Sequence, residues 1–123
     1  MTVLLSIKPE YVERIFAGSK RYEYRRRLPL QRPSKIVIYA TSPVSQIVGE
    51  FTVTEVIEDS PERLWQRTRR HGGVKAQFFR AYFSGRATAY AYKVGEMRKY
   101  DQPVEPKEAL ENFSAPQSFR YLR

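Results

Sequence analysis

The sequence predicts an α+β fold: a small curved sheet or barrel of about five or six strands, flanked by three helices. Short β-prone segments and amphipathic helical segments follow one another in mixed order. One long strand changes phase along its length, as strands do where a bulge or bend turns a sheet. The chain has 123 residues, the usual size of one domain, so we expect a single domain over residues 2–122.

The first two expected elements are a buried strand and an amphipathic helix. The apolar run Val3–Ile7 predicts the strand. Pro9 then stands in the first turn of a helix, where its missing N–H costs nothing, and Gly18 ends that helix. Its buried stripe consists of Tyr11, Val12, Ile15 and Phe16.

Three further strands are expected before residue 60. The alternating segment Tyr22–Arg27 predicts one, the apolar segment Lys35–Ala40 predicts a central one, and Gln46–Ile57 predicts a long one. Alternation in the long strand breaks at Val56, which indicates a bulge or bend. In the first of the three, one face holds Tyr22, Tyr24 and Arg26 and the other holds Glu23, Arg25 and Arg27.

Two helices are expected in the middle of the chain. Ser60 followed by Pro61 is the pattern of an N-cap with proline in the first turn, and this helix runs to about Arg70. The pair Gly72–Gly73 ends it. A second helix follows and closes at Gly85, with four aromatic residues facing the core: Phe78, Phe79, Tyr82 and Phe83.

The last third of the chain predicts mainly strands. Residues 86–100 alternate large side chains with small ones, which predicts one strand, or a hairpin with its turn at Gly95–Glu96. After a loop at Pro106, a short helical piece is expected over Glu108–Asn112. A final strand is expected within residues 116–122.

The composition excludes several classes of chemistry. The chain has no cysteine, which rules out disulfides, thiolate catalysis and iron–sulfur clusters, and it has one histidine, His71. The acidic residues are scattered, and neither a phosphate-binding loop nor a dinucleotide-binding glycine pattern occurs, so we expect no metal and no cofactor. No apolar run approaches the ~18 residues of a membrane span. The N-terminus lacks a secretory signal, so we expect a cytoplasmic protein without a membrane partner.

The charge balance is the first indication of a partner. Lys and Arg number 22 against 13 Asp and Glu, which gives a net charge of +9. Arginine predominates, and its permanently charged, planar group pairs with phosphate, so we expect a nucleic-acid or nucleotide-like partner. A generic basic protein, or one that contacts anionic lipid, is the alternative. No exposed apolar patch is evident, and we expect no obligate protein partner.

The segment Gly18–Arg27 is the most informative in the chain. A glycine at the helix end places Lys20 just before a strand that carries Glu23 and Arg25 on one face. Small barrels bind ligands at such a strand mouth. Positive charge on Arg25 and Arg27 would lower the pKa of the Lys20 amine, far enough for it to act as a base or nucleophile. Glu23 would stay ionised and either position a substrate donor or balance charge; a solvated basic strand with one ion pair is the alternative.

This segment resembles the ASCH domain, a family of the PUA-like superfamily of small β-barrels. The family's pattern Gly-x-Lys-x-x-Glu-x-Arg is matched by Gly18, Lys20, Glu23 and Arg25. The flanking segments that also look similar are Leu5–Pro9, Ile15–Arg25 and Pro116–Tyr121. The resemblance covers essentially the whole chain, with residues 60–86 matched only in outline. It implies a PUA-like barrel whose cleft binds RNA or a modified nucleoside and is lined by the matched Lys, Glu and Arg.

Members of this family differ in activity. Some are RNA-binding or coactivator-associated modules, one bacterial branch cleaves single-stranded RNA, and another hydrolyses N4-acetylcytidine with a Lys, a Thr and a Glu. In that last branch the lysine corresponds to Lys20, but Glu23 stands at the threonine position, and residues 66–70 hold no acid for the glutamate. The resemblance therefore favours a binding module for RNA or a modified nucleoside. A single-stranded-RNA ribonuclease is the alternative, and an amidohydrolase of an acylated cytidine-type base is a further one.

Other candidate contacts lie outside the motif. Arg63, Arg67 and Arg70 recur on one helix face, which suits a phosphate backbone or simply solvent. Lys8 precedes a helix N-terminus, which attracts anions. The full set of candidate RNA- or nucleobase-binding residues is Lys8, Lys20, Glu23, Arg25, Arg26, Tyr39, Ser42, Arg63, Arg67, Arg70 and Ser118. If the protein is an enzyme, Lys20 and Glu23 are the catalytic candidates.

Substitution of Lys20 is expected to separate a binding module from an enzyme. A module that needs only positive charge at this position should tolerate Lys20→Arg. An enzyme that uses Lys20 as a base should not, because arginine stays protonated.

Overall fold

The computed structural model describes residues 1–110, 113–116 and 119–122. Its strands form one six-stranded sheet in the order β2-β5-β4-β3-β1-β6. Strands β1 and β3 pair in parallel, and the other neighbouring pairs are antiparallel. The strands are β1 Thr2–Ile7, β2 Tyr22–Arg25, β3 Lys35–Ala40, β4 Gln46–Asp59, β5 Ala89–Val104 and β6 Phe119–Leu122.

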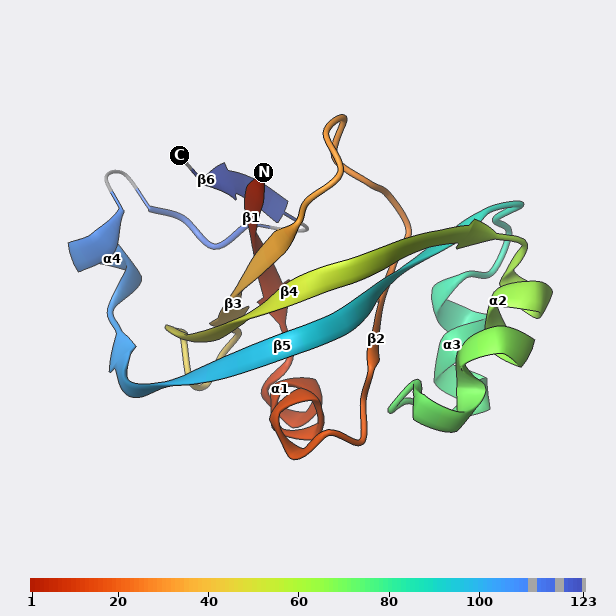
Figure 1. The fold of residues 1–123 in the computed structure, drawn as a ribbon, viewed down its shortest axis with the longest axis horizontal. Coiled ribbons are helices and arrows are strands. Elements are labelled where there is room, and N and C mark those ends of the chain that lie inside the picture. The colour runs from red at the N-terminus through yellow and green to blue at the C-terminus, as the bar shows by residue number, and fades with distance from the viewer. Residues whose placement is uncertain (111–112, 117–118, 123) are drawn as a thin grey trace.

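The helices lie around this sheet, with α1 below it and the others at its two ends (Figure 1). Helix α1 has Pro9 in its first turn and ends at Gly18, whose φ of +85° suits a residue without a side chain. The Ser60 hydroxyl accepts a hydrogen bond from the Arg63 N–H and so caps α2. The helices are α1 Pro9–Ala17, α2 Pro61–Thr68, the 3-10 helix η1 Arg69–His71, α3 Ala76–Tyr82 and α4 Pro106–Ala109.

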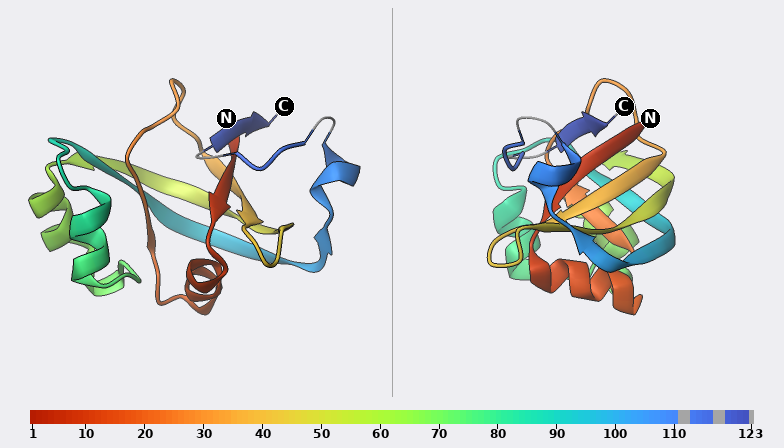
Figure 2. Two further views of the ribbon diagram at one scale, coloured as in Figure 1. Left: turned by 180° about the vertical axis from the view of Figure 1, so that it is seen from behind. Right: turned by 90° about the vertical axis from the view of Figure 1, so that its left-hand side faces the viewer.

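The sheet is strongly curved, as the end-on view in Figure 2 shows. Strands β2 and β1 are not neighbours in the sheet order. The Arg25 guanidinium of β2 nevertheless donates a hydrogen bond to the Ser6 carbonyl of β1, with an N–O distance of 2.8 Å. The long strand β4 shifts register against β5 on both sides of Val53, and such bulges increase twist and bend a strand. The predicted α+β, barrel-like architecture is therefore confirmed.

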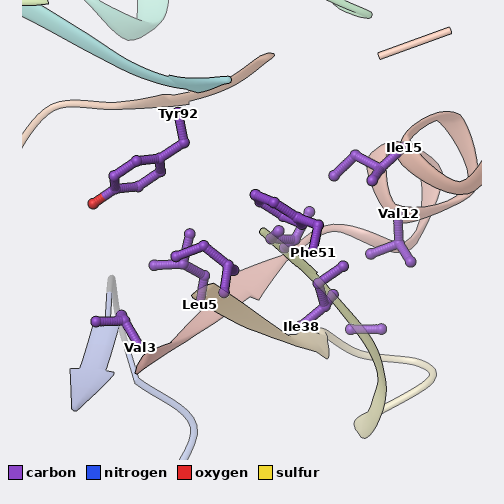
Figure 3. Close-up of a cluster of buried hydrophobic side chains, with 10 residues drawn as sticks. Val3, Leu5, Val12, Ile15, Ile38, Phe51 and Tyr92 are labelled. Atoms are coloured by element: carbon purple, nitrogen blue, oxygen red, sulfur yellow. The ribbon is translucent and has the colours of Figure 1, made fainter. Parts of the chain in front are cut away.

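Of the three apolar clusters among the described residues, two position the helices around the site. The first packs α1 against the concave side of the sheet, where Ile15, Ile38 and Phe51 are each almost fully buried (Figure 3). The second lies where α2 and α3 cover the far end of β4 and β5, and it is built around Leu64 and Phe79. Burying such side chains contributes about 1.5–3 kcal/mol each. The two clusters fix α1 and α3 on neighbouring parts of the sheet.

Several predicted boundaries differ from those in the structure. Residues 89–104 form one strand, so the hairpin alternative is wrong: Gly95 lies inside β5, where a Cβ would come within 2.5 Å of the Thr52 hydroxyl. The helix after Ser60 ends at Thr68 and tightens into η1. The short C-terminal helix begins at Pro106, earlier than expected. Asn112, which that prediction included, lies outside the described residues.

A candidate RNA-binding cleft

A cleft of about 490 Å³ opens where the amino end of α1, the helix α3 and the ends of β1 and β3 meet β2. Its floor is formed by polar side chains of β2 and by Lys20. Aromatic side chains from α1 and α3 form one wall. The turn after β3 and the tail around Pro116 complete the described lining. Ligand pockets usually enclose about 300–1,000 Å³, so this cleft has room for a nucleotide.

Three charged side chains are buried at the floor. Lys20, Glu23 and Arg25 are only 1%, 6% and 7% exposed. Arg25 Nη2 donates to Glu23 Oε2 at 2.8 Å, and Lys20 Nζ lies 3.8 Å from Glu23 Oε1. One carboxylate thus lies between two cations, which leaves an excess of one positive charge at the floor of the cleft. Burying charges is costly, and pairing offsets that cost only when the remaining hydrogen bonds are satisfied.

The local fold explains why these three residues meet. The left-handed Gly18 turns the chain after α1, and the Lys20 N–H then donates to the Arg14 carbonyl oxygen at 3.0 Å. Strand β2 starts at Tyr22, so alternation puts Glu23 and Arg25 on the cleft face. Tyr24, which alternates with them, packs into the second apolar cluster and also borders the cleft. The predicted pairing of Glu23 and Arg25 on one side of β2 is confirmed, but the cleft is not lined from that side alone.

A glycine pair holds Lys20 in place. Lys20 Nζ donates to the Gly72 carbonyl oxygen at 2.6 Å. Gly73 has a φ of +68°, and a Cβ there would lie 2.5 Å from the Lys20 Cβ. The backbone of residues 72–73 therefore lies directly on the lysine side chain, which only glycine permits. Lys20 Nζ also lies 4.8 Å from the centre of the Tyr24 ring and 5.3 Å from that of Tyr11.

The pKa of the Lys20 amine falls to about 8 in these surroundings. Burial is the main cause, because it disfavours the charged form. The Glu23 carboxylate acts in the opposite direction, and the positive charges of Arg25 and Arg14 add to the lowering. The predicted lowering of the Lys20 pKa is confirmed, but its main cause is desolvation. The second arginine that lowers this pKa is Arg14, whereas the sequence suggested Arg27.

The wall of the cleft combines aromatic rings with cations. Tyr11 and Phe78 meet edge to face with ring centres 5.5 Å apart, and Phe78 stacks on Tyr82 at 5.8 Å. Lys8 Nζ lies 5.6 Å from the centre of the Phe78 ring, at the exposed rim of the cleft. Aromatic faces beside cations are the combination that proteins use to bind single-stranded nucleic acids, because bases stack and phosphates pair with the charges.

A comparison with models of protein families identifies the family of this chain. The model of the ASCH domain matches residues 5–90. The chain belongs to the ASCH family. An ASCH domain-containing ribonuclease of Zymomonas mobilis is 35% identical over 127 residues, which span 98% of this chain and 83% of the relative.

Solved structures agree with this assignment. The crystal structure of the ASCH protein from Zymomonas mobilis superposes with a TM-score of 0.92 at 33% identity, and the match covers 99% of this chain and 87% of that one. A more distant relative is the large ribosomal subunit protein uL22 of Ureaplasma parvum. It is 24% identical over 123 residues, which are 99% of this chain and 39% of that protein.

The cleft of this ASCH domain contains about half of the residues predicted to form the site. Lys8, Lys20, Glu23, Arg25, Tyr39 and Ser42 all line it. Arg26 lies outside it, over the ring of Tyr82, and the three arginines of the helical stripe belong to α2 and η1, which contribute nothing to the described lining. Arg67 instead pairs with the Asp59 carboxylate at 3.4 Å. Ser118 lies outside the described residues. The functional roles of all these residues stay predictions.

Sequence reasoning missed two features of the ASCH cleft, an aromatic part of its lining and the backbone that covers Lys20. Phe78 and Tyr82 were assigned to the core together with Phe79 and Phe83, but only the latter two are buried. Helical spacing could have separated them, because residues 78 and 82 share one face of α3 and residues 79 and 83 the next. The glycine pair was interpreted as a helix break, and nothing local in the sequence indicates that it covers Lys20.

Two further observations concern the described part of the chain. None of its His, Asp and Glu side chains gather in a group of three or more that could hold a metal ion. Among the described helices, none is long and apolar enough to cross a membrane.

Proposed function

We propose that this ASCH domain binds single-stranded RNA in the cleft and cleaves it there. The observation that carries the proposal is the buried Lys20–Glu23–Arg25 cluster at the floor of a cleft with an aromatic wall. The family relative named a ribonuclease, which aligns over nearly the whole chain, supports the same activity. RNA recognition is the broader part of the proposal, and cleavage is the narrower part.

The charges in the cleft suit a phosphodiester. Lys8, Lys20 and Arg25 are cationic, and Glu23 is the carboxylate among the described lining residues. Lys8 is exposed at the rim, where an incoming phosphate meets it first, whereas Lys20 and Arg25 lie deeper and are held in fixed positions. Fixed, buried cations attract an anion more strongly than mobile surface charges do.

The aromatic wall suits an unpaired base. Tyr11, Phe78 and Tyr82 are half-buried, so their rings keep accessible surface on the cleft side. A base that stacks on an aromatic side chain contributes about 1–3 kcal/mol. A base inside a duplex already stacks on its neighbours and cannot enter, so the cleft favours single strands.

In the proposed cleavage the 2′-hydroxyl oxygen of the RNA forms a bond to phosphorus and the bond from phosphorus to the 5′-oxygen breaks, which leaves a 2′,3′-cyclic phosphate and a 5′-hydroxyl. The 2′-hydroxyl proton passes to water, and water protonates the departing 5′-oxygen. This reaction requires stabilisation of the charge that develops on the phosphoryl oxygens. The Lys20 ammonium and the Arg25 guanidinium supply it, and Glu23 holds both in position. Removing one group that stabilises such a charge typically slows a reaction about 100- to 1,000-fold. We therefore assign Lys20 and Arg25 the electrostatic role and Glu23 a positioning role.

The test is a cleavage assay on end-labelled single-stranded RNA, duplex RNA and single-stranded DNA, read on denaturing gels. We expect the wild type to shorten single-stranded RNA and to leave the other two intact. Lys20→Met and Arg25→Met should reduce the cleavage rate at least 100-fold. Arg98→Ala, which removes an exposed charge near Tyr100 on β5, should not change it. Identical purification of all four proteins controls for contaminating ribonuclease, and melting curves show that they are folded.

Two outcomes would contradict the proposal at different levels. If single-stranded RNA is bound, and bound more weakly by Lys20→Met, but stays intact, the protein is an RNA-binding module and the proposed cleavage is wrong. The Lys20 amine already donates a hydrogen bond to the Gly72 carbonyl oxygen and pairs with the Glu23 carboxylate. These contacts favour the second candidate function, an RNA-binding module. If neither binding nor cleavage of any polymer is seen, the RNA assignment itself is wrong.

A further inference from the structure

A second groove lies beside the cleft, across the pair Arg26–Tyr82. It has a volume of about 560 Å³ and lies between the end of β2 and the segment that joins α3 to β5. That segment is at the end of the molecule where α2 and α3 lie in Figure 1. Arg26 and Arg86 line the groove, and both are exposed.

The groove is connected to the cleft through two residues. Tyr82 lines the cleft, and Arg26 lines the groove. The Arg26 guanidinium lies over the Tyr82 ring at 4.2 Å, and its Nε donates to the Tyr82 carbonyl oxygen at 2.8 Å. Arg25, the last residue of β2, lines the cleft, and Arg26, which follows the strand, lines the groove. A strand of nucleic acid that leaves the cleft over Tyr82 therefore meets Arg26 next.

The chemistry of the groove suits a phosphate. None of the described residues that line it is acidic, and the two arginines are accompanied by the hydroxyls of Ser84 and Thr88. Arginine binds phosphate through two parallel hydrogen bonds, and hydroxyl groups add donors. The contact with Tyr82 holds Arg26 in place, so less conformational entropy is lost when an anion binds there.

We propose that this groove binds the phosphate of the nucleotide that adjoins the one held in the cleft. The inference rests on the proposed function, because it takes RNA as the occupant of the cleft. It adds a second subsite to the proposed RNA-binding site. It also gives the path of the RNA strand, which runs from the cleft over Tyr82 and Arg26 toward Arg86. The site then recognises at least two consecutive nucleotides, and Tyr82 marks the step between them.

The test compares RNA of increasing length. Dissociation constants are measured for 2′-O-methyl RNA of one, two, three and six nucleotides. This modified RNA is chosen so that binding can be measured separately from cleavage. The proteins are the wild type, Arg26→Ala, Arg86→Ala and the matched charge control Arg98→Ala, each at two salt concentrations. Arg86 and Arg98 are exposed, and melting curves confirm that each variant is folded.

We expect the wild type to gain affinity when the ligand grows from one nucleotide to three. Arg86→Ala and Arg26→Ala should lose about tenfold in affinity for the three- and six-nucleotide ligands and nothing for the mononucleotide. Their dependence on salt should also fall, because one fewer phosphate is neutralised. Arg98→Ala should match the wild type at every length.

Two results would overturn the subsite. If the wild type binds and cleaves RNA, and Arg86→Ala behaves like Arg98→Ala at every length, the groove is not a subsite although the proposed function stands. If Arg86→Ala weakens the mononucleotide as much as the longer ligands, the residue acts through general charge. A wild type that binds no RNA of any length overturns the proposed function and this inference together.

Discussion

At the scale of single residues, Lys20 has its ammonium buried against a carboxylate, two aromatic rings and a backbone carbonyl. Its pKa of about 8 means that the side chain is mostly charged at pH 7 and mostly neutral at pH 9. A neutral amine no longer attracts phosphate. We therefore expect RNA affinity to fall about tenfold as the pH rises through 8.

This prediction is checked by measuring binding of 2′-O-methyl RNA between pH 6.5 and 9. Lys20→Met, whose side chain is neutral and of similar length, should bind more weakly at pH 7 and show a flatter profile. The charged groups that face Lys20 are Glu23, Arg25 and Arg14. If cleavage increases above pH 8 in the wild type and not in the variant, Lys20 acts as a base rather than as a charge.

Gly73 is predicted to be essential because of what it touches. Gly73→Ala places a methyl group in a left-handed backbone, which costs about 1–2 kcal/mol, and also presses it into the Lys20 side chain, which costs about 1–3 kcal/mol more. Gly18→Ala is the matched control, since Gly18 has a φ of +85° but open space around its Cα. Urea denaturation and RNA binding of both variants separate backbone strain from the displacement of Lys20. Equal losses in the two variants would refute the packing argument.

The same packing changes what Lys20→Arg can reveal. The sequence suggested that tolerance of arginine would distinguish a binding module from an enzyme. Lys20 is 1% exposed and lies against the Gly73 backbone, so a larger guanidinium does not fit whatever the chemistry. Sequence spacing predicted that Lys20, Glu23 and Arg25 would come together. It could not predict that a segment 52 residues further along the chain would cover the lysine.

At the scale of secondary structure, local signals predicted most elements well. Proline and glycine mark both ends of α1, and the apolar runs give β1 and β3, because these patterns depend on residues close in sequence. Tertiary context decided the rest. Gly95 would favour a turn in isolation, but pairing along β4 keeps it inside β5, with the Glu96 N–H donating to the Thr52 hydroxyl.

Helix α3 shows why aromatic content alone misleads. Its Phe79 belongs to the second apolar cluster and is 2% exposed, whereas Phe78, one position earlier, lines the cleft. Both residues are equally apolar, so composition cannot separate them. The packing of neighbouring helices determines which of the two is buried. Phe78 contacts Tyr11 of α1, whereas Phe79 contacts Trp65 of α2.

Helix α2 is predicted to matter for stability and not for the cleft. Ser60→Ala removes the hydroxyl that caps its first turn, so we expect the free energy of unfolding to fall by about 1 kcal/mol. RNA cleavage should be unchanged, because α2 supplies none of the described lining residues. Denaturation curves and the cleavage assay on the same protein test both parts. A loss of cleavage without a loss of stability would contradict this prediction and would indicate that the arginines of α2 contact the RNA.

At the scale of the whole molecule, the net charge of +9 predicts salt-sensitive binding. If the cleft and the adjoining groove together neutralise about two phosphates of a short single strand, the slope of log affinity against log salt should be about −1.4. The measurement is a titration of a six-nucleotide RNA at several salt concentrations. A neutral nucleoside serves as the control and should bind with little dependence on salt. A flat profile for the RNA would mean that stacking, and not charge, provides the affinity.

The hydrogen bond from the Ser6 hydroxyl to the Pro116 carbonyl oxygen, at 2.7 Å, has a consequence for synthesis. Translation releases the N-terminal part of a chain first. The basic floor at residues 20–25 therefore leaves the ribosome long before Pro116, the most C-terminal of the described residues that line the cleft. These cations are therefore synthesised before the part of the cleft lining that the tail supplies. The cleft is completed only when the tail emerges and β6 pairs with β1.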